Sequence, residues 1–436
     1  LFALIIIPLF ALENLKLEDA KLKLLNNLEV KISDNVVKQT ILDIQKINNS
    51  RFGQLDIEQT VMNTNDAGNI FVSKLKSRQA SFGDFGFSEF DGTNPNILSV
   101  TPEDLNNPDS DTYYNSKLTY MLPIFVGFKM QSYSDILKSV KKINTMDSKN
   151  VYRLKNIELE RAYYSFRLLK VACQNLKFIL KNVNQLEETT EFMVELGYAK
   201  KIDIMEVATR KENVKRFMFQ VSSHRKVLLS YISFLINEDV ISIIPPEDDL
   251  AYNTNVDKIL NNNIMKKKAD ENIIIKQRMI DIAKSGYYPQ VVGFGELSTT
   301  NDRFMKDAGT NNSYTAGVVV KLNLYNGQDY LEHEKAKLDL IKGKDEQSLV
   351  NSQLRLEVKK TLIEIEGLDN ELMVLKKELE YHIQIYLNYT ERYKESLVSI
   401  NDVIIKESEQ LEKVLEIQKL EYQRNEKIFY LKTIGE

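Results

Sequence analysis

The sequence contains few of the residues that interrupt helices, and it has almost no cysteine. Only 8 prolines and 16 glycines occur among 436 residues, and no proline lies between Ile124 and Ile244 or after Pro289. Because proline breaks the interior of a helix, these two stretches permit very long helices. The single cysteine, Cys173, excludes an intramolecular disulfide and any zinc or iron–sulfur site built from cysteines.

An excess of one charge and long apolar runs are also absent. The 58 basic and 62 acidic residues give a net charge of −4, which argues against nucleic acid as a partner, because proteins that bind it carry a basic surface. No stretch reaches about 18 uninterrupted apolar residues, so we expect no membrane-spanning helix. No nucleophile with its base, phosphate-binding loop or metal-ligand pattern stands out. We therefore expect no enzyme, no cofactor and no metal site.

The first residues of the sequence have the character of a targeting segment. Residues 1–11 read LFALIIIPLFA and are followed by a charged segment. Such a run is typical of the apolar region of a secretory signal peptide, with cleavage expected after Ala11. A short buried strand or the start of a helix is the alternative. We interpret residues 1–11 as the remainder of a signal peptide.

The rest of the sequence contains an internal repeat. Leu122–Gly127 (LPIFVG) matches Leu322–Gly327 (LNLYNG) at an offset of 200 residues. Further matches are Gly197–Asp203 with Ser396–Asp402 at an offset of 199, and Leu25–Asn27 with Leu260–Asn262 at an offset of 235. The shared order of these landmarks predicts two duplicated halves, residues 12–246 and 247–436.

Each half has the same predicted order of elements. In the first half we expect a helix over 13–50, strands over about 54–64 and 115–125, and long helices over 128–196 and 203–238. In the second half we expect a helix over 255–285, strands over about 290–301 and 312–324, and long helices over 328–395 and 401–432. Apolar residues recur every three or four positions in the long helices, which is typical of coiled-coil packing.

The predicted strands 115–125 and 312–324 alternate clearly between apolar and polar residues, whereas 54–64 and 290–301 do so less clearly. All four have lengths that suit a strand crossing a bilayer. Four strands cannot close a barrel, for which about eight are the minimum. An open sheet in lipid would leave its edge N–H and C=O groups without partners. Either the sheet stays in water, or several chains combine their strands. Three chains would give 12 strands, although the residues alone do not fix that number.

These landmarks carry a resemblance to a known family. The matching segments are Leu122–Gly127, Leu322–Gly327, Gly197-x5-Asp203, Tyr393-x2-Ser396-x5-Asp402 and Tyr288-Pro289, together with 65–76 and 105–108. Their order and spacing resemble those of the TolC-like outer-membrane efflux proteins over nearly the whole chain. The resemblance implies a mainly α fold with a small β part. Long antiparallel helices would form a periplasmic tunnel, and each chain would contribute four strands to a 12-stranded transmembrane barrel.

The resemblance also implies location, partners and role. It places a homotrimer in the outer membrane of a Gram-negative bacterium, in contact with outer-membrane lipid and with most of the chain in the periplasm. A periplasmic adaptor (membrane fusion) protein and an inner-membrane transporter of RND or ABC type would complete an efflux or type I secretion system. The channel itself would conduct passively and would have no enzymatic activity.

Individual residues acquire expected roles only through this resemblance. Pro123, Gly127 and Gly327 would mark the corners where strands turn into helices, with glycine permitting a strained turn. Gly197 and Ser396 would form the helix–helix turns where the adaptor docks, together with their neighbours Leu196 and Leu397. At the turns and corners this chain departs from the family pattern, because Ser396 replaces the usual glycine and Gly53 replaces the usual proline.

The expected gate of the channel consists of Tyr393, Asp203 and Asp402. The resemblance implies that Tyr393 bonds Asp203, and that three copies of Asp402 form an acidic constriction. Both aspartates also suit the first turn of a helix, where a carboxylate is favoured. The alternatives are that Asp402 only begins its helix and that Tyr393 only packs between helices. Val398 and Ile405 replace polar gate residues of some family members.

Two other functions remain open from the sequence. The chain could be a soluble periplasmic coiled-coil scaffold with a small docked sheet, or an adaptor protein. The outward faces of the strands distinguish these from a channel, because lipid contact requires an apolar band about 25 Å high. Four tyrosines could contribute to an aromatic girdle at the edges of such a band, namely Tyr113, Tyr114, Tyr120 and Tyr314.

Overall fold

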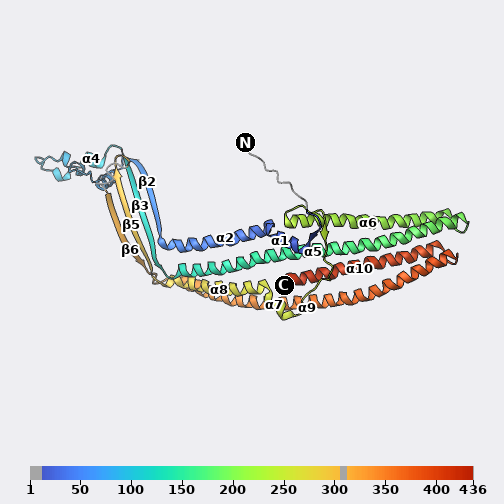
Figure 1. The fold of residues 1–436 in the computed structure, drawn as a ribbon. Coiled ribbons are helices and arrows are strands. Elements are labelled where there is room, and N and C mark those ends of the chain that lie inside the picture. The colour runs from blue at the N-terminus through green and yellow to red at the C-terminus, as the bar shows by residue number, and fades with distance from the viewer. Residues whose placement is uncertain (1–11, 305–311, 436) are drawn as a thin grey trace. The chain divides into compact units, whose positions relative to one another are not determined.

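The computed structural model describes residues 12–304 and 312–435 (Figure 1). The expected signal segment 1–11 lies outside these residues. Contacts divide the chain into a helical unit and a sheet unit. The helical unit takes the described residues of Leu1–Gln39, Lys141–Asn272 and Gly343–Glu436, and the sheet unit takes those of Thr40–Val140 and Ile273–Lys342. Each compact unit combines segments of both predicted halves, so the division at 246/247 stays a prediction about the repeat alone.

Four long helices dominate the structure. They are α5 (Lys129–Glu195), α6 (Lys201–Ile236), α9 (Gly327–Lys394) and α10 (Ile400–Gly435). Their bounds lie within a few residues of the predicted ones. At 1.5 Å per residue, the 67 residues of α5 extend about 100 Å. No proline interrupts them, and apolar side chains at helical spacing, such as Leu176, Ile179 and Val183, are buried between them.

The shorter helices of each half are interrupted. The expected helix 13–50 consists of strand β1 (Leu15–Lys16), α1 (Leu17–Lys23), a 3-10 turn and α2 (Leu28–Asn49). The expected helix 255–285 consists of α7 (Val256–Asn262) and α8 (Ile264–Lys284). Strand β1 pairs in parallel with β4 (Ile243–Ile244). The predictions of unbroken helices are wrong because the side chains of Asn27 and Asn263 cap α2 and α8 at the breaks.

One sheet of four strands forms the core of the sheet unit. Its order is β2 (Gln54–Thr64), β3 (Asp111–Val126), β5 (Gln290–Asn301) and β6 (Asn312–Lys321), and all neighbours are antiparallel. Strand β3 begins four residues earlier than predicted, and β6 ends three residues earlier. The edge strands β2 and β6 have no strand on their outer sides within the described chain.

The connection between β2 and β3 contains helical segments that the sequence did not indicate. Helix α3 (Ala67–Lys76) packs at the end of the sheet, and three 3-10 turns and α4 (Glu103–Asn106) follow. Ile70 of α3 is buried, and Arg78 donates a hydrogen bond to the carbonyl oxygen of Asn312 at 2.8 Å. None of the helices in the described ranges combines the length and the apolar character needed to cross a membrane.

Candidate functional site

The two faces of the four-stranded sheet differ sharply in chemistry. Directly paired residues point to the same face, and the pairing aligns Ile57, Leu118, Leu297 and Tyr314 in one row. We call this side the apolar face; its exposed members include Leu55, Ile57, Leu297, Tyr314, Val318 and Val320. Ile57 is 82% and Tyr314 is 81% exposed, so no part of the described chain covers these side chains.

All charged residues of the four strands lie on the opposite side. We call this side the charged face; its charged members are Asp56, Glu58, Asp111, Lys117, Glu296 and Lys321. Tyr114, Tyr120 and Tyr314 belong to the apolar face, as an aromatic girdle would require. Tyr113 belongs to the charged face and is buried, so the expectation that it contributes to the girdle is wrong.

The corner after β3 requires its glycine. Gly127 has φ +63°, and a Cβ atom at this position would lie 2.6 Å from the carbonyl oxygen of Ser285. A side chain is therefore excluded by both strain and space. The neighbouring Phe128 packs edge-on against Phe125 and Tyr288. At Pro123 the pairing of β3 with β5 shifts register, which suits a residue without an N–H group.

The corresponding glycine of the second half has no such role. Gly327 is the first residue of α9 and is not among the residues with positive φ. A Cβ atom there would meet only the Tyr325 hydroxyl, at 3.6 Å. The expectation that Gly327 permits a strained turn is wrong. Gly53, by contrast, has φ +78°, which proline cannot adopt, and this explains the departure from the family pattern at that position.

The two helix–helix turns share one geometry. After α5, the amide of Gly197 bonds the carbonyl of Val194 and the amide of Tyr198 bonds that of Met193. After α9, the amides of Ser396 and Leu397 make the equivalent bonds to Tyr393 and Arg392. These are Schellman motifs, in which the residue after the cap is left-handed. Gly197 has φ +82°, and Ser396 has φ +59° although it is not glycine.

Large apolar side chains are exposed around these turns. Leu196 is 54% and Leu397 is 63% exposed, and sequence reasoning missed the still more exposed Tyr198 at 71%. A groove runs between the two turns; it is lined by Glu188, Thr189, Phe192, Met193, Leu196, Tyr198, Lys394, Glu395 and Ser396. Contiguous exposed apolar surface of this kind marks interaction sites.

Asp203 and Asp402 both occupy the third position of their helices. The Asp203 carboxylate accepts the backbone N–H of Lys200 at 2.8 Å. The Asp402 carboxylate accepts both the hydroxyl of Ser399, at 2.7 Å, and its backbone N–H, at 3.0 Å. The Ser399 hydroxyl, and secondarily its N–H, lower the pKa of the Asp402 carboxyl. Both residues therefore begin helices, and Asp402 is half-buried and negatively charged.

Tyr393 does not bond Asp203 within this chain. Its buried hydroxyl bonds the hydroxyl of Thr190 on α5, with an O···O distance of 3.4 Å. The direct Tyr393–Asp203 bond implied by the resemblance is therefore wrong for the chain described here, because the Asp203 side chain turns back to cap α6. Burial raises the pKa of the Tyr393 hydroxyl, the hydrogen bond with Thr190 opposes this shift, and the negative charge of Asp203 adds to it.

We compared the sequence and the structure of the chain with those of known proteins. No protein-family model matches the chain, and no curated protein sequence matches it. Solved structures do match. The channel VceC of Vibrio cholerae has TM-score 0.74 and 13% identity, covering 96% of both chains. The CmeC channel of Campylobacter jejuni has TM-score 0.73 and 13% identity, covering 96% of this chain and 85% of CmeC. CusC, described as forming a transmembrane channel, has TM-score 0.75 and 12% identity, covering 98% and 94%.

The chain has the fold of these outer-membrane channels. The expected fold class is thereby confirmed, although the level of identity supports the fold alone. Within the described residues, no group of three or more histidine, cysteine, aspartate or glutamate side chains is placed to hold a metal ion.

This channel fold contains a buried ion pair that sequence reasoning missed. Arg210 of α6 bonds Glu407 of α10, and the Glu407 side chain is 1% exposed. Burial raises the pKa of the Glu407 carboxyl, and the Arg210 guanidinium opposes this shift only in part. The other carboxylate oxygen has no hydrogen-bond partner among the described residues. A charged residue within the apolar stripe of α10 was the available signal.

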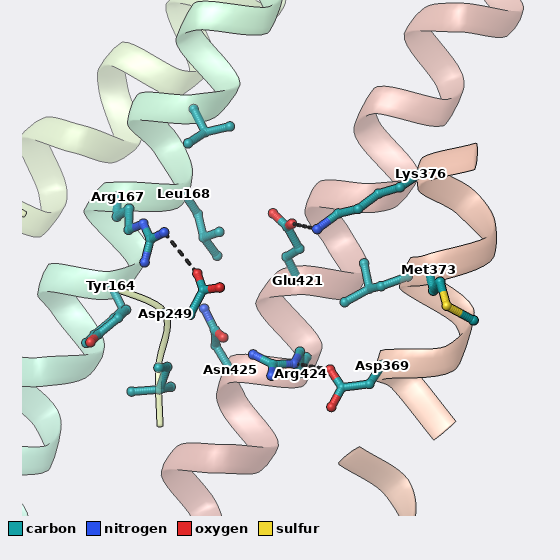
Figure 2. A pocket seen from close by; sticks show the side chains of 13 residues that line it. Tyr164, Arg167, Leu168, Asp249, Asp369, Met373, Lys376, Glu421, Arg424 and Asn425 are labelled. Carbon is teal, nitrogen blue, oxygen red and sulfur yellow. Dashed lines mark hydrogen bonds and ion pairs between the residues drawn. The ribbon is translucent and has the colours of Figure 1, made fainter. Parts of the chain in front are cut away.

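The charged side chains that line a cavity of the helical unit are all paired with one another (Figure 2). It lies between α5, the segment before α7, α9 and α10. Arg167 pairs with Asp249 at 2.9 Å, Lys376 with Glu421 at 3.0 Å, and Arg424 with Asp369. Because its charges are paired, the cavity has the character of a structural contact between segments.

Proposed function

We propose that the chain is one subunit of an outer-membrane export channel, which conducts substrates passively after an inner-membrane pump has delivered them. The division of the sheet into an apolar and a charged face carries this proposal. An apolar face with side chains up to 82% exposed is costly in water but suits lipid, and a charged face suits a water-filled lumen. The fold shared with outer-membrane channels supports the same role.

The open edges of the sheet support an oligomer. Strands β2 and β6 run in opposite directions, so β6 of one copy can pair antiparallel with β2 of the next. We propose a homotrimer, in which three times four strands close a 12-stranded barrel. Exposed apolar residues also recur at helical spacing along α6 (Phe219, Val227 and Phe234) and α9 (Leu349, Leu356 and Ile363). These stripes would pack between copies.

The exposed turns would contact the rest of the export system. We assign Leu196, Gly197, Ser396 and Leu397 to docking of a periplasmic adaptor, and the groove beside them supports this assignment. The transporter would be of RND or ABC type. Asp402, Tyr393 and Asp203 remain the proposed constriction and gate, with Tyr393 acting through Thr190 rather than through a direct bond to Asp203.

A soluble periplasmic scaffold or adaptor is the second candidate. It would require another element to cover the apolar face, and the described chain provides none. Membrane fractionation separates the two candidates. We expect the full-length protein in the outer membrane of a Gram-negative host, extracted only by detergent, as a trimer by light scattering, with conductance in planar bilayers. Recovery as a soluble monomer without detergent would overturn the channel proposal.

A further inference from the structure

Exposed aromatic side chains gather in the connection between β2 and β3. Phe82, Phe87 and Phe90 are 83%, 59% and 57% exposed. Their rings pack in series, because the ring centroids of Phe82 and Phe87, and those of Phe87 and Phe90, are each 6.1 Å apart. We call these three residues the phenylalanine patch. Contiguous exposed apolar surface on a connecting segment marks an interaction site.

The backbone that carries the patch is held by contacts within the same connection. Lys74 Nζ pairs with the Asp84 carboxylate at 2.6 Å. The Glu89 carboxylate accepts the backbone N–H groups of Glu103 and Asp104, both at 2.9 Å. The patch is therefore presented by an ordered scaffold, which reduces the loss of entropy when a partner binds.

Negative charge accompanies the patch. Residues 79–110 contain six acidic residues and no basic residue. Asp84 and Glu89 stabilise the connection itself. The side chains of Asp104 and Asp109 are exposed and make no ion pair in the part of the chain that the structure describes. Their charges are therefore available to a partner of opposite sign.

A cavity of about 570 Å³ adjoins the patch. Gly83 and Ser88, which are chain neighbours of patch residues, line this cavity together with the carboxylates of Asp104, Asp109 and Asp111. Its volume lies in the range of small-ligand sites. Among the described residues, acidic side chains are nowhere grouped to hold a metal ion. An ammonium or guanidinium group is the cation that suits such a cavity.

One buried hydroxyl group on this side of the sheet lacks a partner. Tyr113 and Asp111 point to the same side because they are two residues apart in β3, and Asp111 lines the cavity. Tyr113 is 4% exposed, and its hydroxyl oxygen has no hydrogen-bond partner among the described residues. A buried polar group without a partner is costly, and the N–H group of a bound cation would supply a donor.

We propose that the phenylalanine patch and the adjoining cavity form a docking site for a protein segment that combines apolar side chains with lysine or arginine. The apolar side chains would cover the three rings, and a cationic side chain would enter the cavity among the carboxylates. A second copy of this chain carries the same six acidic residues, and a phosphate-bearing lipid surface is also negative, so charge repulsion disfavours both. This inference goes beyond the proposed function and does not depend on it.

Binding of a synthetic amphipathic peptide of leucine and lysine to the full-length protein in detergent tests the proposal. A peptide with glutamate in place of lysine is the matched probe, and empty micelles are the blank. In fluorescence anisotropy, we expect the lysine peptide to bind more tightly by about tenfold or more. The difference should shrink as salt rises, because the screening length falls from about 10 Å at 0.1 M to about 3 Å at 1 M.

Variants of the site separate its two parts. The triple variant Phe82→Ser/Phe87→Ser/Phe90→Ser should weaken binding of the lysine peptide by about tenfold or more. The double variant Asp104→Asn/Asp109→Asn should weaken binding and lower its dependence on salt. Because it keeps the shape of both exposed side chains, it stays informative even if the triple variant does not fold.

Phe52→Ser is the control, since it removes a phenylalanine that is 74% exposed outside this connection. It should leave binding unchanged. Equal binding of the two peptides, or equal binding by wild type and both site variants, would overturn the inference.

Two further readouts test the other occupants. The triple variant could leave peptide binding unchanged while it weakens binding to phosphatidylglycerol vesicles or changes the oligomer in light scattering. The patch would then meet lipid or a second copy, and the inference would be wrong. Conductance in planar bilayers is measured separately, so a failure here leaves the channel proposal standing.

Discussion

Asn27 and Asn263 make the same pair of contacts in the two halves of the chain. The amide of Asn27 donates to the carbonyl of Leu235 at 2.8 Å, and that of Asn263 donates to the carbonyl of Ile434 at 2.5 Å. Each side-chain oxygen also caps the following helix. The two residues are 236 positions apart, so the offset of 235 that the sequence suggests aligns Asn27 with the wrong residue, Asn262.

Removing either buried asparagine side chain should therefore destabilise the protein. Asn27→Ala and Asn263→Ala each lose a helix cap and leave a carbonyl without its donor, which should cost about 1–3 kcal/mol. Thermal unfolding followed by circular dichroism would measure the loss. Asn262→Ala, at an exposed position beside Asn263, is the matched control and should have little effect; an equal loss there would contradict the assigned register.

The two Schellman turns should respond oppositely to substitution. Gly197→Ala places a side chain in the left-handed region, where no steric clash adds to the strain, and should cost about 1–2 kcal/mol. Ser396→Gly relieves that strain at the equivalent turn and should be neutral or stabilise by up to about 1 kcal/mol. Unfolding free energies in denaturant would show both signs. Destabilisation by Ser396→Gly would contradict the argument.

Removal of one partner of the buried Arg210–Glu407 pair should strongly lower the free energy of unfolding. Arg210→Met leaves a carboxylate buried without compensation and should cost about 3–5 kcal/mol, whereas Arg210→Met/Glu407→Leu should be nearly neutral or stabilising. Lys211→Met, which breaks the more exposed pair with Glu187, is the control and should cost less than about 1 kcal/mol. Equal effects of the two single variants would show that burial does not matter here.

The same pair should make stability depend on pH. Because the pKa of Glu407 is raised in the folded state, the folded chain binds more protons than the unfolded chain above the ordinary value of 4.5. The free energy of unfolding should then fall as pH rises from 4.5 through the folded pKa. Glu407→Gln should remove that part of the decline in a series of unfolding curves. An unchanged slope would mean that Glu407 does not titrate in this window.

A charged substitution should impair assembly on the apolar face of the sheet but not on the charged face. Ile57→Lys places a charge on the side proposed to meet lipid and should cost about 2–4 kcal/mol in the bilayer. Thr60→Lys on the same strand faces the opposite side and is the control. Yield of folded oligomer in the outer membrane would measure the difference. Equal assembly of both variants would argue against lipid contact.

Asp402 should contribute to block by multivalent cations if it lines a constriction. Asp402→Asn keeps an oxygen that can accept the Ser399 amide but removes the charge, so block by a trivalent cation in planar bilayers should weaken while stability changes little. Asp203→Asn, at the equivalent helix position, is the control and should alter block less. Unchanged block in Asp402→Asn would leave Asp402 with only its capping role.

The repeat and the alternation of the strands predict much of this fold because both can be read from the order of residue types along the chain. The equivalence of Gly197 with Ser396, and of Asp203 with Asp402, is visible as spacing. It reappears as the same turn hydrogen bonds and the same backbone N–H to carboxylate bond, to which Asp402 adds the Ser399 hydroxyl. The breaks at Asn27 and Asn263 were missed because apolar periodicity continues on both sides of an asparagine whether it caps a helix or lies within one.

Contacts between distant segments could not be predicted in the same way. Whether Tyr393 reaches Thr190 or Asp203 depends on the rotation of α9 relative to α5, which single-sequence spacing does not report. The burial of Glu407 likewise depends on how α10 meets α6. The separation of charge between the two faces of the sheet could be predicted only in part. Alternation along each strand predicts two faces, but only the register shows that Asp56 and Glu296 share a row.

The open edges β2 and β6 also have a consequence before any channel exists. A single subunit of the proposed channel would expose two unpaired rows of backbone N–H and C=O groups beside the uncovered apolar face. Unpaired strand edges of this kind can pair with other chains and lead to fibrils. In water, such a subunit would be prone to aggregate through these edges even at low concentration. In a subunit of the proposed channel, any partner that covers these edges until the copies meet would therefore protect it from aggregation.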